Sequence, residues 1–436
     1  MCASLLGARR REAVSKLKPG RKGGLSPSRL VSLPAGAGRG EHAPCSRVEF
    51  GDLTRMAFML KPAGRGSFRE QALEILAELK GLVAKEPGPM TITVQTVFLS
   101  RAADQGECEA LFRAHYGQEL PVTNFVIQPP CCGAALALEA WSAGGKSARI
   151  ERFGPNTLTV ACDGVRWVYC GGITPSAGLQ DAYGQTLDAL ARMSEALRLA
   201  GCSFSQTIRT WFYLEGINRP EAAARRYQEL NRARSVFYSD IPFRSAQFQT
   251  QRPHPLYPAS TGIGMSAASL LASCVALETS RDDLLLLALE NPQQTPAYAY
   301  DAKYSGQSPK FSRAMALLLD DCAVTWISGT ASIVGSETRY PGDIEKQTEQ
   351  TIDNIRRLIS RDNFAAHGVA GAGATLGDLA KIRVYLKRQE DLDKCRAVCV
   401  REFGAIPAIY AVADVCRPEL LVEIEGTAFS RCSPRK

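Results

Sequence analysis

Apolar residues recur at helical spacing in three separate segments of the chain, and each segment carries a glutamine near its start. In the third segment, Ile352, Ile355 and Leu358 lie three or four positions apart, as on one face of a helix. The three predicted helices span residues 68–79, 182–193 and 347–358, with the glutamines Gln71, Gln185 and Gln350. This repetition predicts three copies of one structural unit.

The segments around each glutamine helix repeat as well. An alternating apolar strand follows each helix, at residues 94–100, 208–216 and 381–388. A second amphipathic helix comes next, at residues 108–117, 225–238 and 394–404. A further strand precedes each glutamine helix, at residues 56–61, 166–174 and 324–333. We therefore expect an α/β (α+β) fold of tandem β-α-β-α-β units at residues 47–142, 149–279 and 300–430.

A sheet with two helices on one face leaves its other face bare, and that face must be covered. Three units in one chain can cover these faces for one another. We therefore expect the three units to close into a pseudo-trimer, so that the chain is a monomer or a small homo-oligomer.

Each unit ends in an apolar strand, and the last of these strands carries two acids. Alternation places Glu423 and Glu425 on the same face of that strand. In the first unit, Glu139 stands seven residues after Cys132, just as Glu423 stands seven residues after Cys416. The corresponding position of the middle unit is expected at Ser273. A buried carboxylate needs a partner or a chemical role, so this strand is the first candidate for a functional site.

The net charge of +8 comes from the first 40 residues, which hold nine Lys or Arg and one acid, Glu12. The rest of the chain is near neutral, which argues against a nucleic-acid groove. The composition of residues 1–46 predicts a disordered basic tail. It is open to interpretation as a solvated extension, an early start codon or a transit peptide. No apolar run is long enough for a membrane span.

The 14 cysteines are scattered and there are only four histidines, without zinc-ligand spacing. Buried, reduced thiols in a cytoplasmic protein are the expected interpretation. No metal site is predicted.

The three units resemble the reactive-intermediate deaminase (Rid, or YjgF-like) superfamily, whose trimers hold their active sites between neighbouring subunits. The resemblance rests on "ISGT", "QTIDNI", "VYL" and "VEIEG". The arginine typical of those deaminases would fall near Ile409, where no basic residue stands. This departure argues against deamination by the third unit.

The last two units resemble a narrower group, the chorismatase family. The motifs are "RYQELNRAR", "YPASTGIGMS", "SPKFSRA", "ISGTASIVGSETRYPGDIEKQT" and "DVCRPELLVEIEG". The resemblance implies an enzyme that acts on chorismate, releases pyruvate and uses no cofactor. It also implies that Glu423 is the acid that protonates the enol ether, with a pKa raised by burial. The alternative for Glu423 is a carboxylate paired with an arginine between units. Glu425 is expected at the rim of the site.

Chorismate is a dianion, so its site needs cations and hydroxyl groups. Tyr227 and Arg234 lie two helical turns apart on one helix face and are chosen for this role. The resemblance implies that a tyrosine and an arginine of the loop leading into the third unit touch the substrate, and Tyr300 and Arg313 are chosen. The alternatives in that loop are Tyr304 and Lys310, with Arg383 and Arg417 as further candidates elsewhere. Arg225, Arg226 and Arg232 point to other helix faces and are expected in solvent.

The resemblance also separates two product types. Cys416 together with Gly329 matches the type that forms the aromatic product, 3-hydroxybenzoate. An aliphatic residue with alanine matches the type that forms a dihydroxycyclohexadiene carboxylate. Cys416 is too far from Glu423 to share its strand position and must reach the site from the preceding turn. A small core residue is the alternative for Cys416, and a non-catalytic Rid-like binder of small acids is the alternative for the whole protein. The first unit is expected to be a scaffold.

Overall fold

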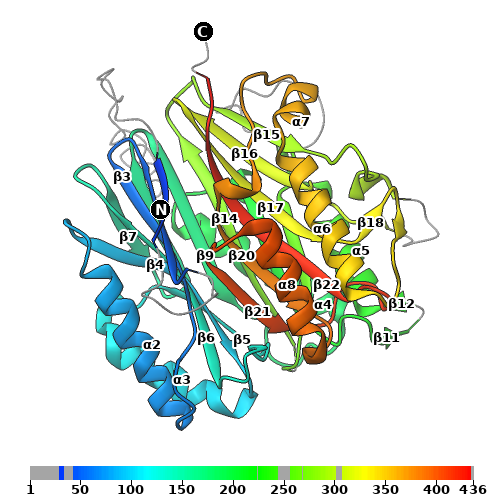
Figure 1. Cartoon of the computed structure of the whole chain (residues 1–436), viewed down its shortest axis with the longest axis horizontal. Helices are drawn as coiled ribbons and strands as arrows, with labels where there is room; N and C mark the ends of the chain where they lie inside the picture. The colour runs from blue at the N-terminus through cyan, green and yellow to red at the C-terminus, as the bar shows by residue number, and fades with distance from the viewer. Residues whose placement is uncertain are drawn as a thin grey trace, which may run out of the picture.

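The computed structural model describes residues 29–33, 43–222, 224–243, 256–267, 269–300 and 307–433. Within them the chain forms three six-stranded sheets, each built from one stretch of the sequence. Helices cover the outside of the molecule and strands fill its centre (Figure 1). The protein is therefore a mixed α/β fold, as expected.

The three sheets share a common order of elements. The first contains β1 (Arg29–Leu33), β2 (Cys45–Phe50), β3 (Leu53–Leu60), β6 (Leu136–Gly144), β4 (Met90–Leu99) and β5 (Val122–Val126), with α2 (Phe68–Val83) and α3 (Gln105–Tyr116). The second contains β13 (Ala259–Met265), β10 (Thr207–Glu215), β14 (Leu270–Thr279), β9 (Val165–Ile173), β8 (Thr157–Cys162) and β7 (Arg149–Phe153), with α4 (Ala182–Leu199) and α5 (Arg226–Ser239). The third contains β15 (Leu285–Leu289), β16 (Ala314–Leu319), β17 (Cys322–Ala331), β22 (Val422–Arg431), β20 (Leu379–Leu386) and β21 (Ala408–Val412), with α6 (Ile344–Ile359), α7 (Arg361–Ala366) and α8 (Leu392–Phe403).

The predicted disorder of residues 1–46 is wrong at two places. Residues 29–33 form β1, which pairs with β2, and β2 begins at Cys45. Ser46 is buried and donates its hydroxyl to Ala380 O of the third sheet at 2.7 Å. Residues 1–28 and 34–42 lie outside the described residues.

A buried glutamine at the fourth position of each first helix joins the helix to the rest of its unit. Gln71 and Gln185 hold this position in α2 and α4. In α6 it is held by Gln347, so the choice of Gln350 for the third unit is wrong. Gln347 accepts from Leu421 N at 2.8 Å and donates to Glu419 O at 2.9 Å. It therefore fixes the turn that leads into β22.

Strand register corrects the predicted correspondence of the acids. In each sheet the register with the closing strand shifts at one residue of the neighbouring strand β4, β10 or β20, namely at Val94, Arg209 and Lys381. Two residues farther on, Thr96, Trp211 and Arg383 lie opposite Glu139, Ser273 and Glu425. Glu139 and Ser273 thus correspond to Glu425, and not to Glu423 as predicted. Glu423 lies opposite Tyr385, and the matching positions hold Ala137 and Leu271.

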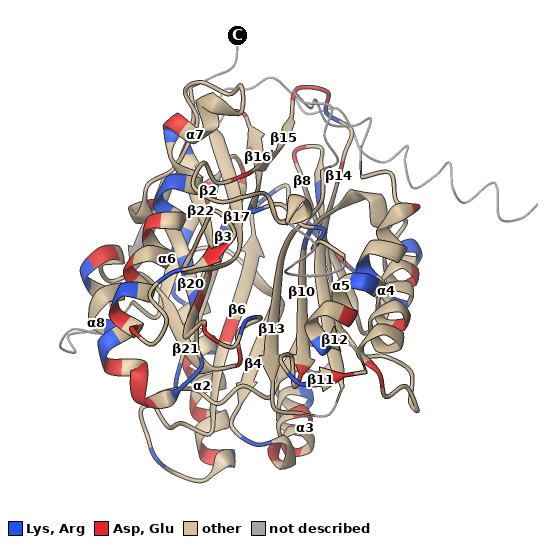
Figure 2. Ribbon diagram, turned by 90° about the vertical axis from the view of Figure 1, so that its right-hand side faces the viewer, with Lys and Arg blue, Asp and Glu red and all other residues tan. Residues whose placement is uncertain are grey.

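Hydrogen bonds join every pair of sheets. Gly172 N donates to Asn124 Oδ1 at 2.8 Å, Gly329 N donates to Thr261 Oγ1 at 3.0 Å, and Val412 N donates to Pro129 O at 2.8 Å. Acidic and basic residues alternate along the outer helices, as on α4, α6 and α8 (Figure 2). Within the described part of the chain, no helix combines the length and the apolar character that crossing a membrane requires.

Candidate active site

One cavity of about 580 Å³ collects the residues predicted from the sequence. It lies between α5 and β13 of the second sheet and β17, β22 and the turn before β22 in the third. All seven chosen residues line it: Tyr227, Arg234, Tyr300, Arg313, Gly329, Cys416 and Glu423. Arg417 lines it as well, whereas Arg383 lines a second cavity at the centre of the molecule. Tyr304 lies outside the described residues.

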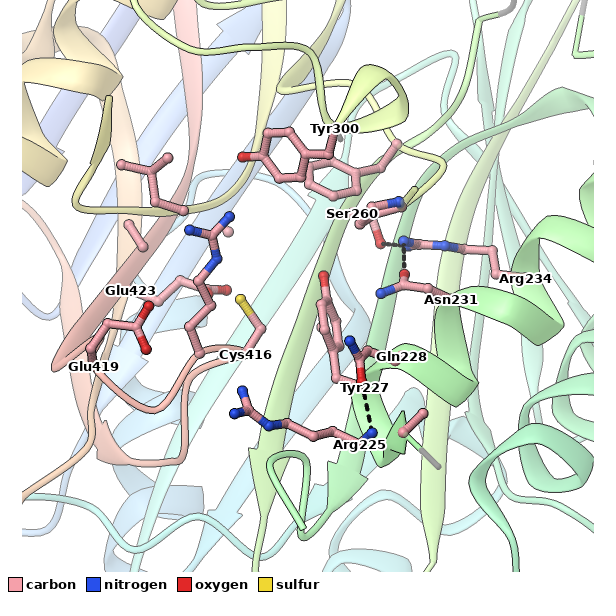
Figure 3. A pocket seen from close by; sticks show the side chains of 18 of the residues that line it. Arg225, Tyr227, Gln228, Asn231, Arg234, Ser260, Tyr300, Cys416, Glu419 and Glu423 are labelled. Atoms are coloured by element: carbon pink, nitrogen blue, oxygen red, sulfur yellow. Dashed lines mark hydrogen bonds between the residues drawn. The ribbon is translucent and has the colours of Figure 1, made fainter. Parts of the chain in front are cut away.

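Figure 3 shows how the cavity divides into two walls. Glu423 and Cys416 lie on one side, and Tyr227 and Arg234 face them from the other. The first wall belongs to the third sheet and the second to α5. The site therefore exists only because two units pack against each other.

Glu423 is a buried carboxyl group with a raised pKa. Only 4% of the residue is exposed. Burial raises the pKa of Glu423 to about 8, and Glu425 raises it further, whereas Arg209 and Arg313 lower it. The carboxyl is therefore protonated at neutral pH, and it faces a cavity large enough for a small organic acid.

Glu425 is fully buried, so its predicted place at the rim is wrong. Arg209 Nη2 donates to it at 2.6 Å, Trp211 Nε1 at 2.9 Å, and Arg383 Nη1 lies 3.2 Å away. Burial alone would raise the pKa of Glu425, but Arg383 and Arg209 lower it to about 2. Two neighbouring carboxyls on one strand face thus hold opposite protonation states.

Gly329 lies directly against the carboxyl of Glu423. A Cβ built at residue 329 would lie 2.0 Å from Glu423 Oε1 and 3.3 Å from Thr261 Cγ2. Thr261 accepts the Gly329 N–H and donates its own hydroxyl to Glu425. A glycine is required for Glu423 to hold the orientation that the structure shows.

The corresponding interfaces between the other units lack the combination of a glycine and an acid that Gly329 and Glu423 provide. Gly172 matches Gly329 by register, but a Cβ there would meet Thr123 O at 2.8 Å. Asn124 fills the place of Thr261, and Leu271 replaces the acid. At the third junction Met59 replaces the glycine and is buried in an apolar cluster with Ile409. Neither of these two junctions pairs a glycine with an acid.

Two buried arginines, Arg234 and Arg313, line the cavity. Arg234 Nη1 donates to Ser260 at 3.1 Å and Nη2 donates to Asn231 at 2.5 Å. Arg313 Nη2 donates to Thr295 O at 3.1 Å and to the Tyr300 hydroxyl at 2.5 Å. Within the described chain, the Nε of each arginine is buried without a hydrogen-bond partner. Both side chains can therefore take up a carboxylate without breaking an existing ion pair.

Arg226 is not in solvent, so that prediction is wrong. It is 2% exposed, pairs with Glu221, and donates to Gln185 Oε1 at 3.0 Å. Arg225 and Arg232 are exposed, as expected, although Arg225 also lines the outer part of the cavity. The position of these arginines on the helix distinguished them from Arg234. It could not show that Arg226 pairs with Glu221 and is buried.

Tyr227 is held against the backbone of β13. A Cβ built at Gly262 would lie 3.0 Å from Tyr227 Cε2, so the glycine admits the ring. Burial raises the pKa of Tyr227 above its usual range, and Cys416 and Glu423 raise it further. The phenol therefore remains a hydrogen-bond donor at physiological pH.

Cys416 lies in the turn between β21 and β22, as expected from its distance to Glu423. Burial and the neighbouring Glu423 raise the pKa of the thiol to about 12. The thiol is therefore protonated and is a poor nucleophile at neutral pH. Cys132, its counterpart in the predicted repeat, is exposed and lies outside both cavities.

Three residues that support the site were not singled out from the sequence: Thr261, Gln347 and Glu290. Thr261 follows "YPAS" inside a quoted motif, so its position was visible but its partners were not. Gln347 could have been identified from the sequence, because each of the three units has a glutamine at the fourth position of its first helix. Glu290 lies one residue beyond the last pair of β15 and β16, which places it opposite Arg313. Burial raises the pKa of Glu290 to about 7, and Arg313 lowers it.

The described residues contain no group of three or more His, Cys, Asp or Glu side chains arranged to hold a metal ion.

Comparison with known proteins gives related sequences and a related fold, although no family model matches the chain. A protein named 3-hydroxybenzoate synthase, from Streptomyces hygroscopicus, is 34% identical over 297 residues, which cover 67% of this chain and 81% of that protein. A chorismatase from the same organism is 34% identical over 221 residues, or 50% of this chain and 60% of that protein. A crystal structure of a chorismatase superposes with a TM-score of 0.60 at 22% identity, over 85% of this chain and 98% of that one.

Proposed function

The chain belongs to the chorismatase family, and we propose that it is an enzyme that converts chorismate to 3-hydroxybenzoate and pyruvate. The relative that it matches over most of its length is named for synthesis of that aromatic acid.

The observation that carries the proposal is the protonated carboxyl of Glu423 in the cavity. Cleavage of an enol ether begins with protonation of its terminal methylene carbon, which is slow and needs a well-placed acid. A pKa of about 8 keeps the proton on Glu423 at neutral pH, whereas an ordinary carboxyl would have lost it.

In the proposed reaction, Glu423 gives its proton to the methylene carbon of the enolpyruvyl group. The electron pair of the double bond forms the new C–H bond, and the ether oxygen shares the resulting positive charge. The Glu423 carboxylate left behind faces this cation. The 4-hydroxyl oxygen of the substrate then attacks ring carbon C3, the bond between C3 and the ether oxygen breaks, and pyruvate leaves. The C4–O bond of the resulting protonated epoxide opens, and loss of the C3 proton to the Glu423 carboxylate restores the acid and leaves 3-hydroxybenzoate.

Arg234 and Arg313 are proposed to bind the two carboxylates of the substrate. Each is buried and lines the cavity, and its Nε has no hydrogen-bond partner among the described residues. Tyr300 and Tyr227 provide hydroxyl groups beside them. A carboxylate bound to a buried guanidinium forms a charge-assisted hydrogen bond, which fixes its orientation as well as adding affinity.

Cys416 and Gly329 are proposed to direct the cation toward the aromatic product. The protonated thiol occupies the wall opposite Tyr227, and Gly329 leaves the Glu423 carboxyl its space. Both features restrict where a water molecule can stand beside the cation.

We also propose that the three sheets represent three Rid-like units in a closed pseudo-trimer, with the complete site that the described residues form lying between the second and third units. This arrangement needs no further subunit. Thirteen cysteines of the described chain are unbridged, which fits a reducing compartment such as the cytoplasm.

Release of pyruvate from chorismate, followed by a coupled lactate dehydrogenase reaction, tests the proposal. Chromatography with mass detection then identifies the organic product. An absence of pyruvate with folded protein would reject the proposed function.

A further inference from the structure

A second, small cavity lies at the junction of the three sheets, away from the candidate active site. Its volume is about 50 Å³, several times what one water molecule requires. Five aromatic side chains form much of its wall: Trp141, Tyr169, Trp211, Trp326 and Phe429. Its remaining lining includes three cations and one carboxylate, which are Arg55, Lys381, Arg383 and Glu139.

Among the residues that the structure describes, the buried charges around this cavity do not balance. Glu139 pairs with Lys381 at 3.2 Å and with Arg383. Glu425, just behind the wall, pairs with Arg383 and with Arg209. These two carboxylates serve three cations, all of which are at most 4% exposed.

Arg55 adds a fourth cation without adding an acid. It comes from β3 of the first sheet and is 5% exposed. Its guanidinium donates to the Tyr169 hydroxyl and lies 5.2 Å from the Trp141 ring centre. Its Nε is buried without a hydrogen-bond partner. Aromatic faces attract a guanidinium, but they do not neutralise it.

We propose that the central cavity binds one halide-sized inorganic anion, such as chloride, held by Arg55 and Lys381. Removing unpaired charge from water costs several kcal/mol per ion, and an anion removes that cost where a water molecule cannot. The substrate of the main site is too large for this volume.

A neutral Lys381 is the competing explanation, because burial lowers its pKa. It would leave three arginines against two carboxylates, so one positive charge would still be unbalanced. The anion is therefore needed in either protonation state of Lys381.

Crystals of the full chain grown in sodium bromide, with diffraction measured across the bromine absorption edge, test this site. An anomalous peak between Arg55 and Lys381 is the expected result. A resident chloride that does not exchange would give its own anomalous peak at long wavelength and would also support the site. Water alone, or a tetrahedral oxyanion, would overturn the proposal.

Thermal denaturation gives a second test in solution. At constant ionic strength, replacing gluconate with bromide should raise Tm by about 2 °C for each tenfold excess over the dissociation constant. Arg55→Met should abolish this halide-specific rise. Arg69→Met, at an exposed helical arginine paired with Glu107, should retain it. An equal rise in the Arg55 variant would contradict the proposed ligand.

Discussion

Gly329 has no side chain, and the space that its Cβ would occupy overlaps with the carboxyl of Glu423. A single methyl group at residue 329 would approach Glu423 Oε1 to 2.0 Å and Cδ to 2.8 Å. The end of a glutamate side chain can rotate, so the methyl would move the acid and not the strand. A substitution here therefore acts on the position of the proton donor as well as on the size of the pocket.

The first prediction concerns the product. The double variant Cys416→Val with Gly329→Ala adds bulk, removes the thiol and turns the Glu423 carboxyl. We expect pyruvate release to continue, because the acid remains. The organic product should shift from 3-hydroxybenzoate toward the dihydroxycyclohexadiene carboxylate, which differs by one water and is separated by mass.

The single variants separate the two contributions. Gly329→Ala alone should lower kcat about tenfold or more, because proton transfer depends on sub-ångström placement of the acid. Cys416→Val alone should leave kcat within a few-fold and change only the product ratio. An unchanged kcat for Gly329→Ala would show that Glu423 does not need its present orientation.

The second prediction concerns the acid itself. Glu423→Gln keeps the size of the side chain and removes its transferable proton. Turnover should fall by at least about a hundredfold, with an unchanged circular dichroism spectrum. Glu195→Gln, at an exposed helical position, is the matched control and should keep full activity. Normal pyruvate release by the Glu423 variant would remove the residue from the mechanism.

Glu139→Gln is not a neutral control, although the sequence repeat suggested one. Glu139 pairs with both Lys381 and Arg383 in the protein interior. Removing one partner of a buried pair leaves a buried charge uncompensated and costs about 3–5 kcal/mol. The expected defect of this variant is therefore in stability.

The third prediction links the pKa of Glu423 to pH. The folded pKa of about 8 exceeds the ordinary value of 4.5, so the group favours folding below pH 4.5 and loses that contribution as pH rises through 8. Glu423→Gln cannot ionise and should be more stable than wild type at pH 9, by up to about 5 kcal/mol. Denaturant unfolding at pH 5 and pH 9 measures the difference, which should be small at the lower pH. In wild type, kcat/KM should fall above about pH 8.

The sequence could predict which residues meet, but not the charges that surround them. Alternation along β22 placed Glu423 and Glu425 on one face, and that is where both lie. The same alternation could not tell that Arg209 and Arg383, from two different sheets, converge on Glu425 and bury it. The predicted rim position failed because ion pairs between sheets leave no local pattern.

Repeat spacing had the same limit. Counting from cysteines matched Glu139 with Glu423, whereas the shifts in strand pairing match it with Glu425. The loops before the closing strands of the first and third units, residues 127–135 and 413–421, are equally long. Cys132 and Cys416 stand two positions apart within these loops, so counting from the cysteines moved the match by two residues. Helix position would have chosen Gln347 over Gln350, because the fourth residue of the helix is the one that reaches the closing strand.

The fourth prediction concerns the two arginines that line the cavity. Arg234→Ala and Arg313→Ala should each weaken binding of a non-reactive dicarboxylate by tenfold or more, because each leaves one carboxylate without its charged partner. Calorimetric titration measures the affinity. Arg232→Ala, on the exposed face of the same helix, should bind normally. Unchanged affinity in both cavity variants would place the substrate elsewhere.

The last prediction concerns Glu290, which stands behind Arg313. Its pKa of about 7 means that the carboxyl ionises as pH rises through neutrality. An ionised Glu290 offsets the charge of Arg313, and a protonated one does not. A dianion bound to Arg313 should therefore raise the pKa of Glu290, and binding near pH 7 should be accompanied by proton uptake. Titration in buffers of different ionisation enthalpy measures this uptake. Ionisation of Glu290 should also raise the KM of wild type between pH 6 and pH 8. Both the proton uptake and this rise in KM should disappear in Glu290→Gln. His367 accepts the backbone N–H of Glu290 at 3.1 Å, so its imidazole is a second titratable group beside this residue. The variant His367→Asn should keep the proton uptake, and its loss there would assign the effect to the histidine instead.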